Sequence, residues 1–210
     1  MLRRFLSKEH GGDAIEIGCV PGNWMVYLNK EYGYRVSGID YSEHLDYVAK
    51  NLELNDIRDF TLFHDDLFTF TSAIRYDLVF SSGFVEHFDD HNRVIERHAE
   101  LAKPGGLVAI MVPNLTHVHR ILCGMFAPDL LAKHRFPLMH RTVLAEALEK
   151  AGLEVLFCDY HKTFRPVYSM PPLFSLAARA VQRLLRMCRL DDMGNRFGSP
   201  YLISIARRPA

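Results

Sequence analysis

Two glycines and an acid near the start of the chain have the spacing of a ligand-binding turn. Residues 13–24 are predicted to form a short apolar strand, a tight turn that contains Gly18 and Gly22, and the start of a helix. Because glycine lacks a Cβ, such a turn brings backbone amides and a helix N-terminus close to a small ligand. Glu16 lies on the strand just before the turn, where its carboxylate is placed to receive an ammonium group.

A second acid continues this pattern. Asp40 lies 18 residues after Gly22, at the end of a predicted strand over 35–39. A carboxylate at that place in a strand–turn–helix unit binds both hydroxyl groups of a ribose. A ligand with an amino-acid end and a ribose would therefore engage both Glu16 and Asp40. Two simpler interpretations stay open: the glycines form an ordinary tight turn, and Asp40 only begins a helix.

The turn departs from the motifs that bind other nucleotides. The run from Gly18 to Gly22 lacks the second glycine of the dinucleotide fingerprint GxGxxG, and no Lys-Ser or Lys-Thr pair follows it as in a P-loop. A nicotinamide-dependent oxidoreductase is therefore disfavoured.

Alternating strands and helices must position these residues. Short apolar runs predict strands, and apolar residues at intervals of three and four predict helices, with Ser42 and Asp90 as the expected N-caps of two of them. Strands are predicted at 14–17, 35–39, 60–64, 76–82, 107–112, 154–160 and 201–206, and helices at 23–32, 42–55, 90–102, 142–151 and 171–190. This alternation predicts an α/β sandwich with a mostly parallel sheet.

The composition is that of an ordinary globular domain without net charge. Twenty-five basic residues balance 25 acidic ones, so no nucleic-acid partner is expected. The four cysteines are scattered and no ligand spacing with histidine occurs, so neither a disulfide framework nor a metal site is expected. The apolar runs are too short for a signal peptide or a membrane span, which indicates a soluble, cytoplasmic protein.

The chain resembles the class I S-adenosylmethionine-dependent methyltransferases, in particular their type 11, 12 and 23 small-molecule branch. Residues 16–22 (EIGCVPG) resemble the first motif of that family, E/DxGxGxG, with Val20 where a glycine is common. Segments similar to four further motifs follow in family order at 36–42, 65–67, 76–88 and 101–106. The resemblance implies a three-layer sandwich, formed by one domain over 1–210, with a seven-stranded, mostly parallel sheet whose last strand is antiparallel.

The resemblance also implies S-adenosyl-L-methionine as the cofactor and names the residues that bind it. Asp40 would hold the ribose, Tyr41 would flank the adenine, and Asp66 would accept a hydrogen bond from the adenine amino group beside the Leu67 amide. The full cofactor-binding set is Glu16, Gly18, Cys19, Gly22, Asp40, Tyr41, Asp66, Leu67, Ser82 and Gly83.

Histidines are the candidates for acid–base chemistry, because an imidazole near neutral pH accepts a hydroxyl proton. His87 follows the fourth predicted strand, where the active site of the family opens, and His134 ranks next; His117 and His119 also follow a strand end. The simpler interpretation of His87 is a helix-entry histidine that bonds a backbone carbonyl, and Glu86 would then brace the cofactor loop.

Two segments, 114–141 and 161–198, lie where this family inserts covers over the acceptor, and their aromatic residues favour a small-molecule acceptor. Within them, 171–190 predicts an amphipathic helix with leucines and alanines on one face and arginines opposite. Packing of the apolar face on the sheet or on a second subunit of a homodimer is favoured over peripheral contact with an anionic membrane.

The predicted function is methylation of a small molecule, most readily at oxygen, with a saccharide or lipid-linked intermediate as one candidate acceptor. The alternative is a cofactor-binding partner or regulatory subunit without turnover.

Overall fold

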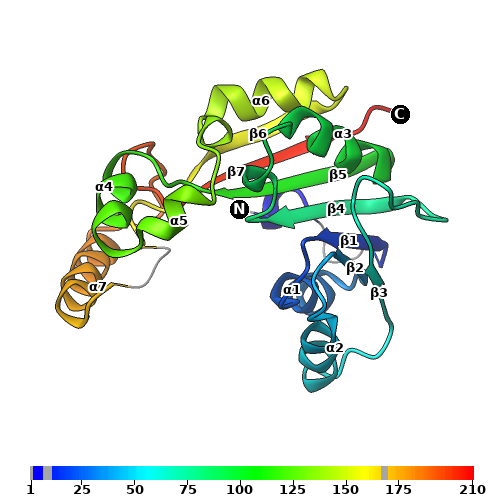
Figure 1. Cartoon of the computed structure of the whole chain (residues 1–210), viewed down its shortest axis with the longest axis horizontal. Helices are drawn as coiled ribbons and strands as arrows, with labels where there is room; N and C mark the ends of the chain where they lie inside the picture. Colours follow the sequence, from blue (N-terminus) through cyan, green and yellow to red (C-terminus); the bar gives the residue numbers. More distant parts are fainter. Residues whose placement is uncertain (1, 7–10, 167–169) are drawn as a thin grey trace.

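A single sheet organises the computed structural model, which describes residues 2–6, 11–166 and 170–210 (Figure 1). Its seven strands lie in the order β3-β2-β1-β4-β5-β7-β6. They are β1 (Asp13–Ile17), β2 (Arg35–Asp40), β3 (Phe60–His64), β4 (Tyr76–Ser82), β5 (Ala102–Pro113), β6 (Glu154–His161) and β7 (Tyr201–Arg207). The pairs among β1 to β5 are parallel, and β7 is antiparallel to both β5 and β6. The predicted sheet and its antiparallel last strand are confirmed.

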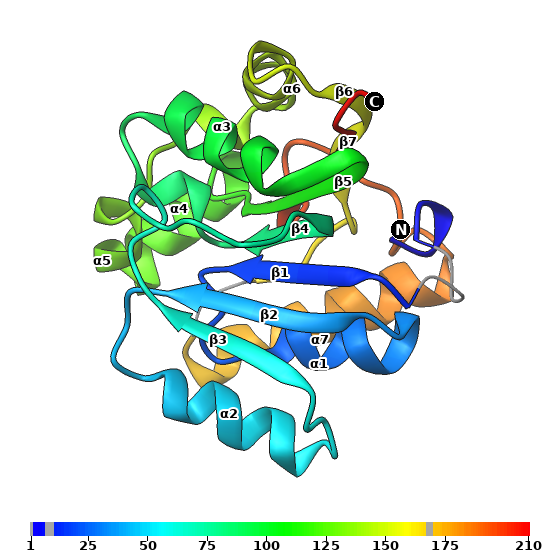
Figure 2. The same cartoon turned by 90° about the vertical axis from the view of Figure 1, so that its right-hand side faces the viewer.

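Helices cover both faces of this sheet. Figure 2 shows α3 and α6 on one side and α1 and α2 on the other. The α-helices are α1 (Asn23–Tyr32), α2 (Leu45–Leu54), α3 (His91–Leu101), α4 (His117–Phe126), α5 (Pro128–Ala132), α6 (Arg141–Lys150) and α7 (Pro172–Met187). Short 3₁₀ turns lie at η1 (Leu2–Arg4), η2 (Val85–His87) and η3 (Pro137–Met139).

The two faces of the sheet bury two separate apolar clusters. In β4, Leu78 and Phe80 belong to the cluster under α1 and α2, whereas Val79 belongs to the cluster under α3 and α6. This alternation follows from the period of two residues in a strand. It explains why the centre of β4 has three apolar residues in succession, since a central parallel strand is buried on both faces.

One predicted N-cap is confirmed and one is wrong. The Asp90 carboxylate accepts a hydrogen bond from the Arg93 amide at 3.1 Å and caps α3. The second helix begins later than predicted, at Leu45, with His44 in the cap position. The Ser42 hydroxyl instead accepts a hydrogen bond from the His44 amide at 3.2 Å, because the chain between β2 and α2 makes an additional turn before the helix starts.

The apolar face of α7 is exposed, so its predicted packing on the sheet is wrong, while the alternative, packing on a second subunit, stays a prediction. Ala178 is the buried residue of this helix, whereas Leu173 is 75% exposed and Leu184 is 60% exposed. Figure 1 shows α7 at one end of the molecule, away from the sheet. It touches α4 through Phe126 and Phe174, whose ring centroids lie 4.7 Å apart.

Candidate functional site

The glycine turn between β1 and α1 requires glycine at two positions. Gly18 and Gly22 have φ angles of +71° and +88°, which side chains rarely adopt. A Cβ on Gly18 would lie 2.5 Å from the Phe84 ring, and one on Gly22 would lie 2.8 Å from a methyl of Val48. The backbone at this turn is therefore in close contact with its surroundings, as the sequence predicts.

Glu16 supports this turn from inside the protein. Its carboxylate is buried and accepts a hydrogen bond from the Met25 amide in the first turn of α1 at 3.1 Å. Burial raises the pKa of Glu16 to about 8, against the lowering effect of that hydrogen bond. The carboxylate thus fixes the start of α1, while its direct contact with a ligand ammonium stays a prediction.

Cys19 is buried in the same region. Its sulfur lies 2.7 Å from the position that a Cβ on Gly38 would occupy, so the absence of a side chain at Gly38 makes room for it. Burial raises the pKa of the Cys19 thiol well above its ordinary range. The thiol therefore packs between β2 and α1, and any cofactor contact of Cys19 would have to come from its backbone.

A cavity of about 290 Å³ opens beside the turn, at the carboxyl ends of β1, β2 and β3. Four of the predicted cofactor residues line it together. The lining is Ile17, Ile39, Asp40, Tyr41, Asp65, Asp66, Leu67, Phe68, Phe84 and Phe88. We refer to this space as the nucleoside cavity.

The carboxylates of the nucleoside cavity are held by backbone amides. Asp40 accepts from the Val20 amide at 3.2 Å with one oxygen and from the Ser42 amide at 2.8 Å with the other. Asp66 accepts from the Phe68 amide at 2.9 Å. Tyr41 is 77% exposed and lies at the rim. Asp40 is thus both a helix-entry residue and a fixed carboxylate that faces the cavity.

Aromatic walls of this cavity escaped the sequence analysis. The ring centroid of Phe88 lies 5.0 Å from that of Phe84 and 5.6 Å from that of Phe68. The spacing of four residues between Phe84 and Phe88 was the available signal. Apolar rings beside fixed carboxylates suit a purine and a ribose, so the residues present fit an adenosine group.

A second cavity, of about 200 Å³, lies on the other side of Gly83. Its lining is Ser82, Gly83, Glu86, Met111, Pro113, Leu115, Leu130, His134 and Tyr201. Ser82 and Gly83 therefore line this second cavity rather than the nucleoside cavity, and their predicted contact with the cofactor stays untested. Gly83 of this cavity and Phe84 of the nucleoside cavity are consecutive, so both cavities lie near the end of β4. We refer to the second space as the acceptor cavity.

A larger cavity of about 630 Å³ shares Ser82, Met111 and Tyr201 with the acceptor cavity. It extends along α1, where Trp24, Tyr27 and Phe80 contribute aromatic rings. Residues of the predicted cover segment 161–198, of which 167–169 lie outside the described residues, complete the wall with His161, Lys162 and Arg165.

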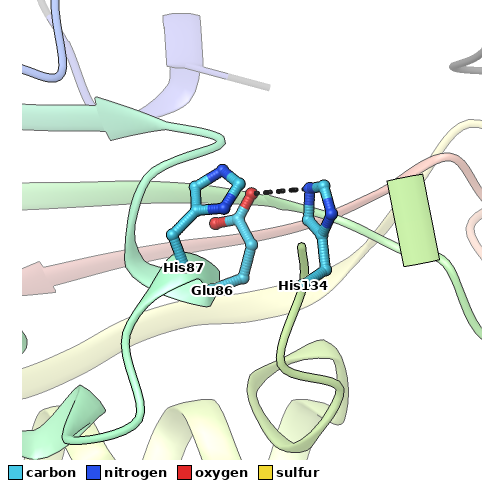
Figure 3. A group of neighbouring side chains, drawn as sticks. All are labelled: Glu86, His87 and His134. Carbon is cyan, nitrogen blue, oxygen red and sulfur yellow. Dashed lines mark ion pairs between the residues drawn. The ribbon is translucent and has the colours of Figure 1, made fainter. Parts of the chain in front are cut away.

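The two predicted catalytic histidines lie on either side of Glu86 (Figure 3). His134 lines the acceptor cavity, whereas His87 is not among its lining residues. The ring centroids of His87 and His134 lie 4.6 Å apart, and His134 Nε2 lies 3.9 Å from Glu86 Oε1. The chain after α5 is fixed to η2 because the Arg135 amide donates to the Glu86 carbonyl at 2.7 Å. We call Glu86, His87 and His134 the acid–histidine cluster.

Glu86 is the unusual member of this cluster. Its side chain is 0% exposed, and within the described residues neither carboxylate oxygen has a hydrogen-bond partner. Burial raises the pKa of Glu86 to about 7 and lowers the pKa of His134. A carboxyl group and an imidazole side by side can exchange a proton with an acceptor.

Hydrogen bonds to backbone carbonyls orient both imidazole rings. His87 Nδ1 bonds the Lys133 carbonyl at 3.0 Å, which is the contact expected of a merely structural histidine. His134 Nδ1 bonds the Leu130 carbonyl at 2.6 Å. In the neutral rings, these bonds leave both Nε2 atoms without a proton.

His117 and His119 are held outside these cavities. His119 is buried, bonds the Gly198 carbonyl at 2.9 Å and stacks on Phe164. His117 lies beside Phe197. Neither residue lines the acceptor cavity, so the expectation that they face an acceptor finds no support in this arrangement.

Comparison with known proteins identifies the family. Residues 1–156 match the family model described as a methyltransferase domain (Methyltransf_23). The chain belongs to the class I S-adenosylmethionine-dependent methyltransferases. S-adenosyl-L-methionine, the methyl donor of this family, is accordingly the cofactor of this methyltransferase.

This methyltransferase is similar in sequence to a ubiquinone biosynthesis O-methyltransferase of Coxiella burnetii. The two are 29% identical over 153 residues, a match that covers 70% of this chain and 65% of the relative. The chain thus spans slightly less than two thirds of that relative.

Solved structures agree in fold. The N-methyltransferase NodS of Bradyrhizobium japonicum, in complex with S-adenosyl-L-homocysteine, has a TM-score of 0.61 at 14% identity over 94% of this chain and 78% of NodS. The [4+2]-cyclase SpnF has a TM-score of 0.70 at 17% identity over 100% of this chain and 78% of SpnF. At such identities the likeness shows the fold alone. Among the described residues, no helix is long and apolar enough to cross a membrane.

Proposed function

We propose that this methyltransferase transfers a methyl group to a hydroxyl oxygen of a small-molecule acceptor. The observation that carries the proposal is the acid–histidine cluster, in which Glu86 and His134 line a cavity at the end of β4, beside the nucleoside cavity in the chain. A hydroxyl acceptor must lose its proton during transfer, and a suitably placed base contributes about 10²- to 10⁴-fold to such a step. The printed name of the Coxiella relative, an O-methyltransferase, supports oxygen over nitrogen.

In this proposal, one set of residues binds the cofactor and another acts on the acceptor. Glu16 and the glycine turn hold α1 in place, and Asp40, Tyr41, Asp66 and Leu67 would bind the nucleoside of the cofactor. His87 and His134 would orient the acceptor hydroxyl and take up its proton. The Glu86 carboxylate lies between the two rings. Positioning alone supplies much of the acceleration when the reacting atoms are held about 3 Å apart in a dry cavity.

The acceptor proposed here has an apolar or aromatic body. The cavity of about 630 Å³ offers Trp24, Tyr27 and Phe80 to such a body. Lys162 and Arg165 lie at its wall and would suit an anionic substituent. The predicted covers, 114–141 and 161–198, contribute His134 and these two cations respectively, which supports their assignment to the acceptor side.

We also infer that α7 contacts an anionic membrane surface, where a lipid-linked acceptor would be found. The exposed apolar residues of the helix include Leu173, Leu176, Val181 and Leu184. Arg179, Arg183 and Arg186 accompany them, and no acidic residue occurs in α7. An apolar face with arginines at its side is the pattern of a helix that lies in a membrane interface, and the sheet covers none of it.

The second candidate is a cofactor-binding subunit without turnover, which the fold by itself would equally accommodate. Radiolabelled S-adenosyl-L-methionine, incubated with the protein and a metabolite extract, separates the two functions. Transfer of label to a small molecule supports the enzyme. Tight cofactor binding without any transfer, in extracts that include membrane lipids, would favour the subunit.

A further inference from the structure

The proposed proton transfer does not explain how the buried carboxylate of Glu86 is stabilised in the acid–histidine cluster. Glu86 is fully buried, and its two oxygens have no hydrogen-bond partner among the described residues. A buried carboxylate without a partner is strongly unfavourable, so such groups are normally paired, hydrogen-bonded or bound to a metal. Something is therefore expected to occupy the space in front of Glu86.

The neutral imidazole of His134 cannot donate a hydrogen bond to the Glu86 carboxylate. Its Nε2 faces Glu86 Oε1 at 3.9 Å, but its Nδ1 faces the Leu130 carbonyl at 2.6 Å. A carbonyl only accepts, so the single proton of the neutral ring belongs on Nδ1, and Nε2 turns a lone pair toward the carboxylate. Two lone-pair-bearing atoms that face each other across this distance are stabilised either by a proton on one of them or by a cation between them.

His87 has the same hydrogen bond to the backbone. Its Nδ1 bonds the Lys133 carbonyl at 3.0 Å, so in the neutral ring the lone pair is on Nε2. Imidazoles that ligate metals commonly donate the opposite N–H to a backbone carbonyl or carboxylate, which fixes the tautomer and the ring orientation. Both histidines of the cluster have this second hydrogen bond.

The three side chains also have the separation of a metal site. One ligand atom from each of Glu86, His87 and His134 lies within 4.8 Å of the others, and Figure 3 shows the two rings on either side of the carboxylate. Ligand atoms about 2.0–2.2 Å from an ion lie somewhat closer together than this, so modest side-chain rotation would complete the site. The helix turn η2 and the chain after α5 are already joined through Arg135 and Glu86.

We propose that Glu86, His87 and His134 bind one divalent transition-metal cation of the zinc class. Two imidazole nitrogens and one carboxylate oxygen form a donor set that such cations prefer over the all-oxygen sites of magnesium or calcium. Three protein ligands leave a further coordination position open, as in catalytic zinc sites. Because Glu86 and His134 line the acceptor cavity, the open position faces the acceptor.

The role of this cation, unlike its binding, rests on the proposed function. A cation that coordinates the acceptor hydroxyl lowers the pKa of that group, so the proton is released to solvent. With the cation bound, His87 and His134 serve as its ligands, and this replaces the role as bases that is proposed for them above. The acceptor O–H bond breaks and an O–C bond forms to the methyl group. The C–S bond breaks with its electron pair on the cofactor sulfur, and the cation keeps its oxidation state.

Cobalt titration of the metal-stripped protein tests the site directly. Co²⁺ is added to protein treated with a chelator, and visible absorption reports a protein-bound ion. The Cys188→Ser background removes the exposed thiol as a competing ligand. We expect one equivalent of Co²⁺ to bind, to be displaced by Zn²⁺, and to bind at least tenfold more weakly to Glu86→Gln and to His134→Gln, since even groups behind the ligands change affinity by about 10- to 100-fold.

His140→Gln is the matched control, because His140 is exposed and precedes α6 outside the cluster. It should leave Co²⁺ affinity unchanged. Absence of a bound-cobalt spectrum, or equal affinity in the wild type and in folded Glu86→Gln and His134→Gln proteins, would overturn the metal site. Calorimetry with S-adenosyl-L-methionine on the same samples reports on the methyltransferase assignment separately, since a failed metal site leaves cofactor affinity intact.

Discussion

Nε2 of His134 lies 3.9 Å from Oε1 of Glu86, although the two residues belong to segments that are distant in the chain. The contact is built by packing: the Arg135 amide donates to the Glu86 carbonyl, and the Arg135 side chain pairs with Asp89. This arrangement brings His134, from the predicted 114–141 cover, close to Glu86 just after β4. In the proposed function, acceptor chemistry and cofactor binding depend on different residues, so we expect mutation to separate them.

The first prediction concerns turnover. His134→Gln keeps the size of the side chain but removes the imidazole from the acceptor cavity. We expect methyl transfer to a metabolite extract to fall by about 10²-fold or more, while the Kd of S-adenosyl-L-methionine stays unchanged because His134 does not line the nucleoside cavity. Label transfer and calorimetry measure the two effects. Unchanged transfer, with His140→Gln as the exposed control, would remove His134 from the reaction.

The second prediction concerns the nucleoside cavity. Asp40→Ala leaves two ribose hydroxyls without their acceptor, and each unpaired polar group costs roughly 1–3 kcal/mol. Cofactor affinity measured by calorimetry should fall by about tenfold or more. The control is Asp46→Ala, on the exposed side of α2. If Asp40→Ala binds the cofactor as tightly as Asp46→Ala does, Asp40 has only its local role with the Val20 and Ser42 amides.

Motif order predicted four residues that line the nucleoside cavity together, while their contact with the cofactor stays a prediction. Asp40, Tyr41, Asp66 and Leu67 come to one cavity because parallel strands end at the same edge of the sheet, and strands are encoded locally by their apolar runs. The aromatic wall formed by Phe84 and Phe88 was missed, since the path of the chain after β4 depends on packing against α3 and the glycine turn.

The acceptor side was predicted less completely. His87 and His134 were expected from their types, but the unpartnered carboxylate of Glu86 between them depends on which way three side chains turn. Periodicity likewise identified the apolar face of α7 and not its surroundings. An amphipathic pattern indicates which residues avoid water. Which surface covers them depends on the rest of the protein or on another molecule.

The third prediction separates backbone strain from crowding. Gly18→Ala and Gly152→Ala both place a Cβ at a positive φ, of +71° and +76°, which costs about 1–2 kcal/mol. The new Cβ would meet the Phe84 ring at Gly18, whereas no atom lies within 4 Å of it at Gly152. Both variants should lose stability in chemical denaturation, and Gly18→Ala alone should lose cofactor affinity. Equal cofactor affinity in the two variants would contradict the role of the turn.

The fourth prediction follows from the buried carboxylate of Glu16. Its pKa is raised from 4.5 to about 8 in the folded protein, so between these values the folded state holds a proton that the unfolded state has released. By linkage, the contribution of Glu16 to the free energy of unfolding is fully present below pH 4.5 and is lost as the pH rises toward 8.

Glu16→Gln cannot ionise and should not show this loss. Urea denaturation of the cofactor-free protein at several pH values across that range measures it as the difference between wild type and variant. Glu43→Gln, which alters an exposed carboxylate, should follow the wild type. A difference between wild type and Glu16→Gln that stays constant with pH would show that Glu16 is ionised throughout.

The last prediction concerns α7 and the surface it contacts. The protein should sediment with vesicles that contain phosphatidylglycerol and remain in solution with vesicles of phosphatidylcholine alone, because each arginine near an anionic surface contributes about 1 kcal/mol. Replacing Leu176 and Leu184 together by Asp removes apolar contact and adds repulsion, so binding should be lost. Leu54→Asp changes an equally exposed leucine of α2 and should bind like the wild type. If the paired variant instead converts a dimer to a monomer in sedimentation velocity while vesicle binding is absent throughout, the apolar face of α7 is a contact between two copies of this chain.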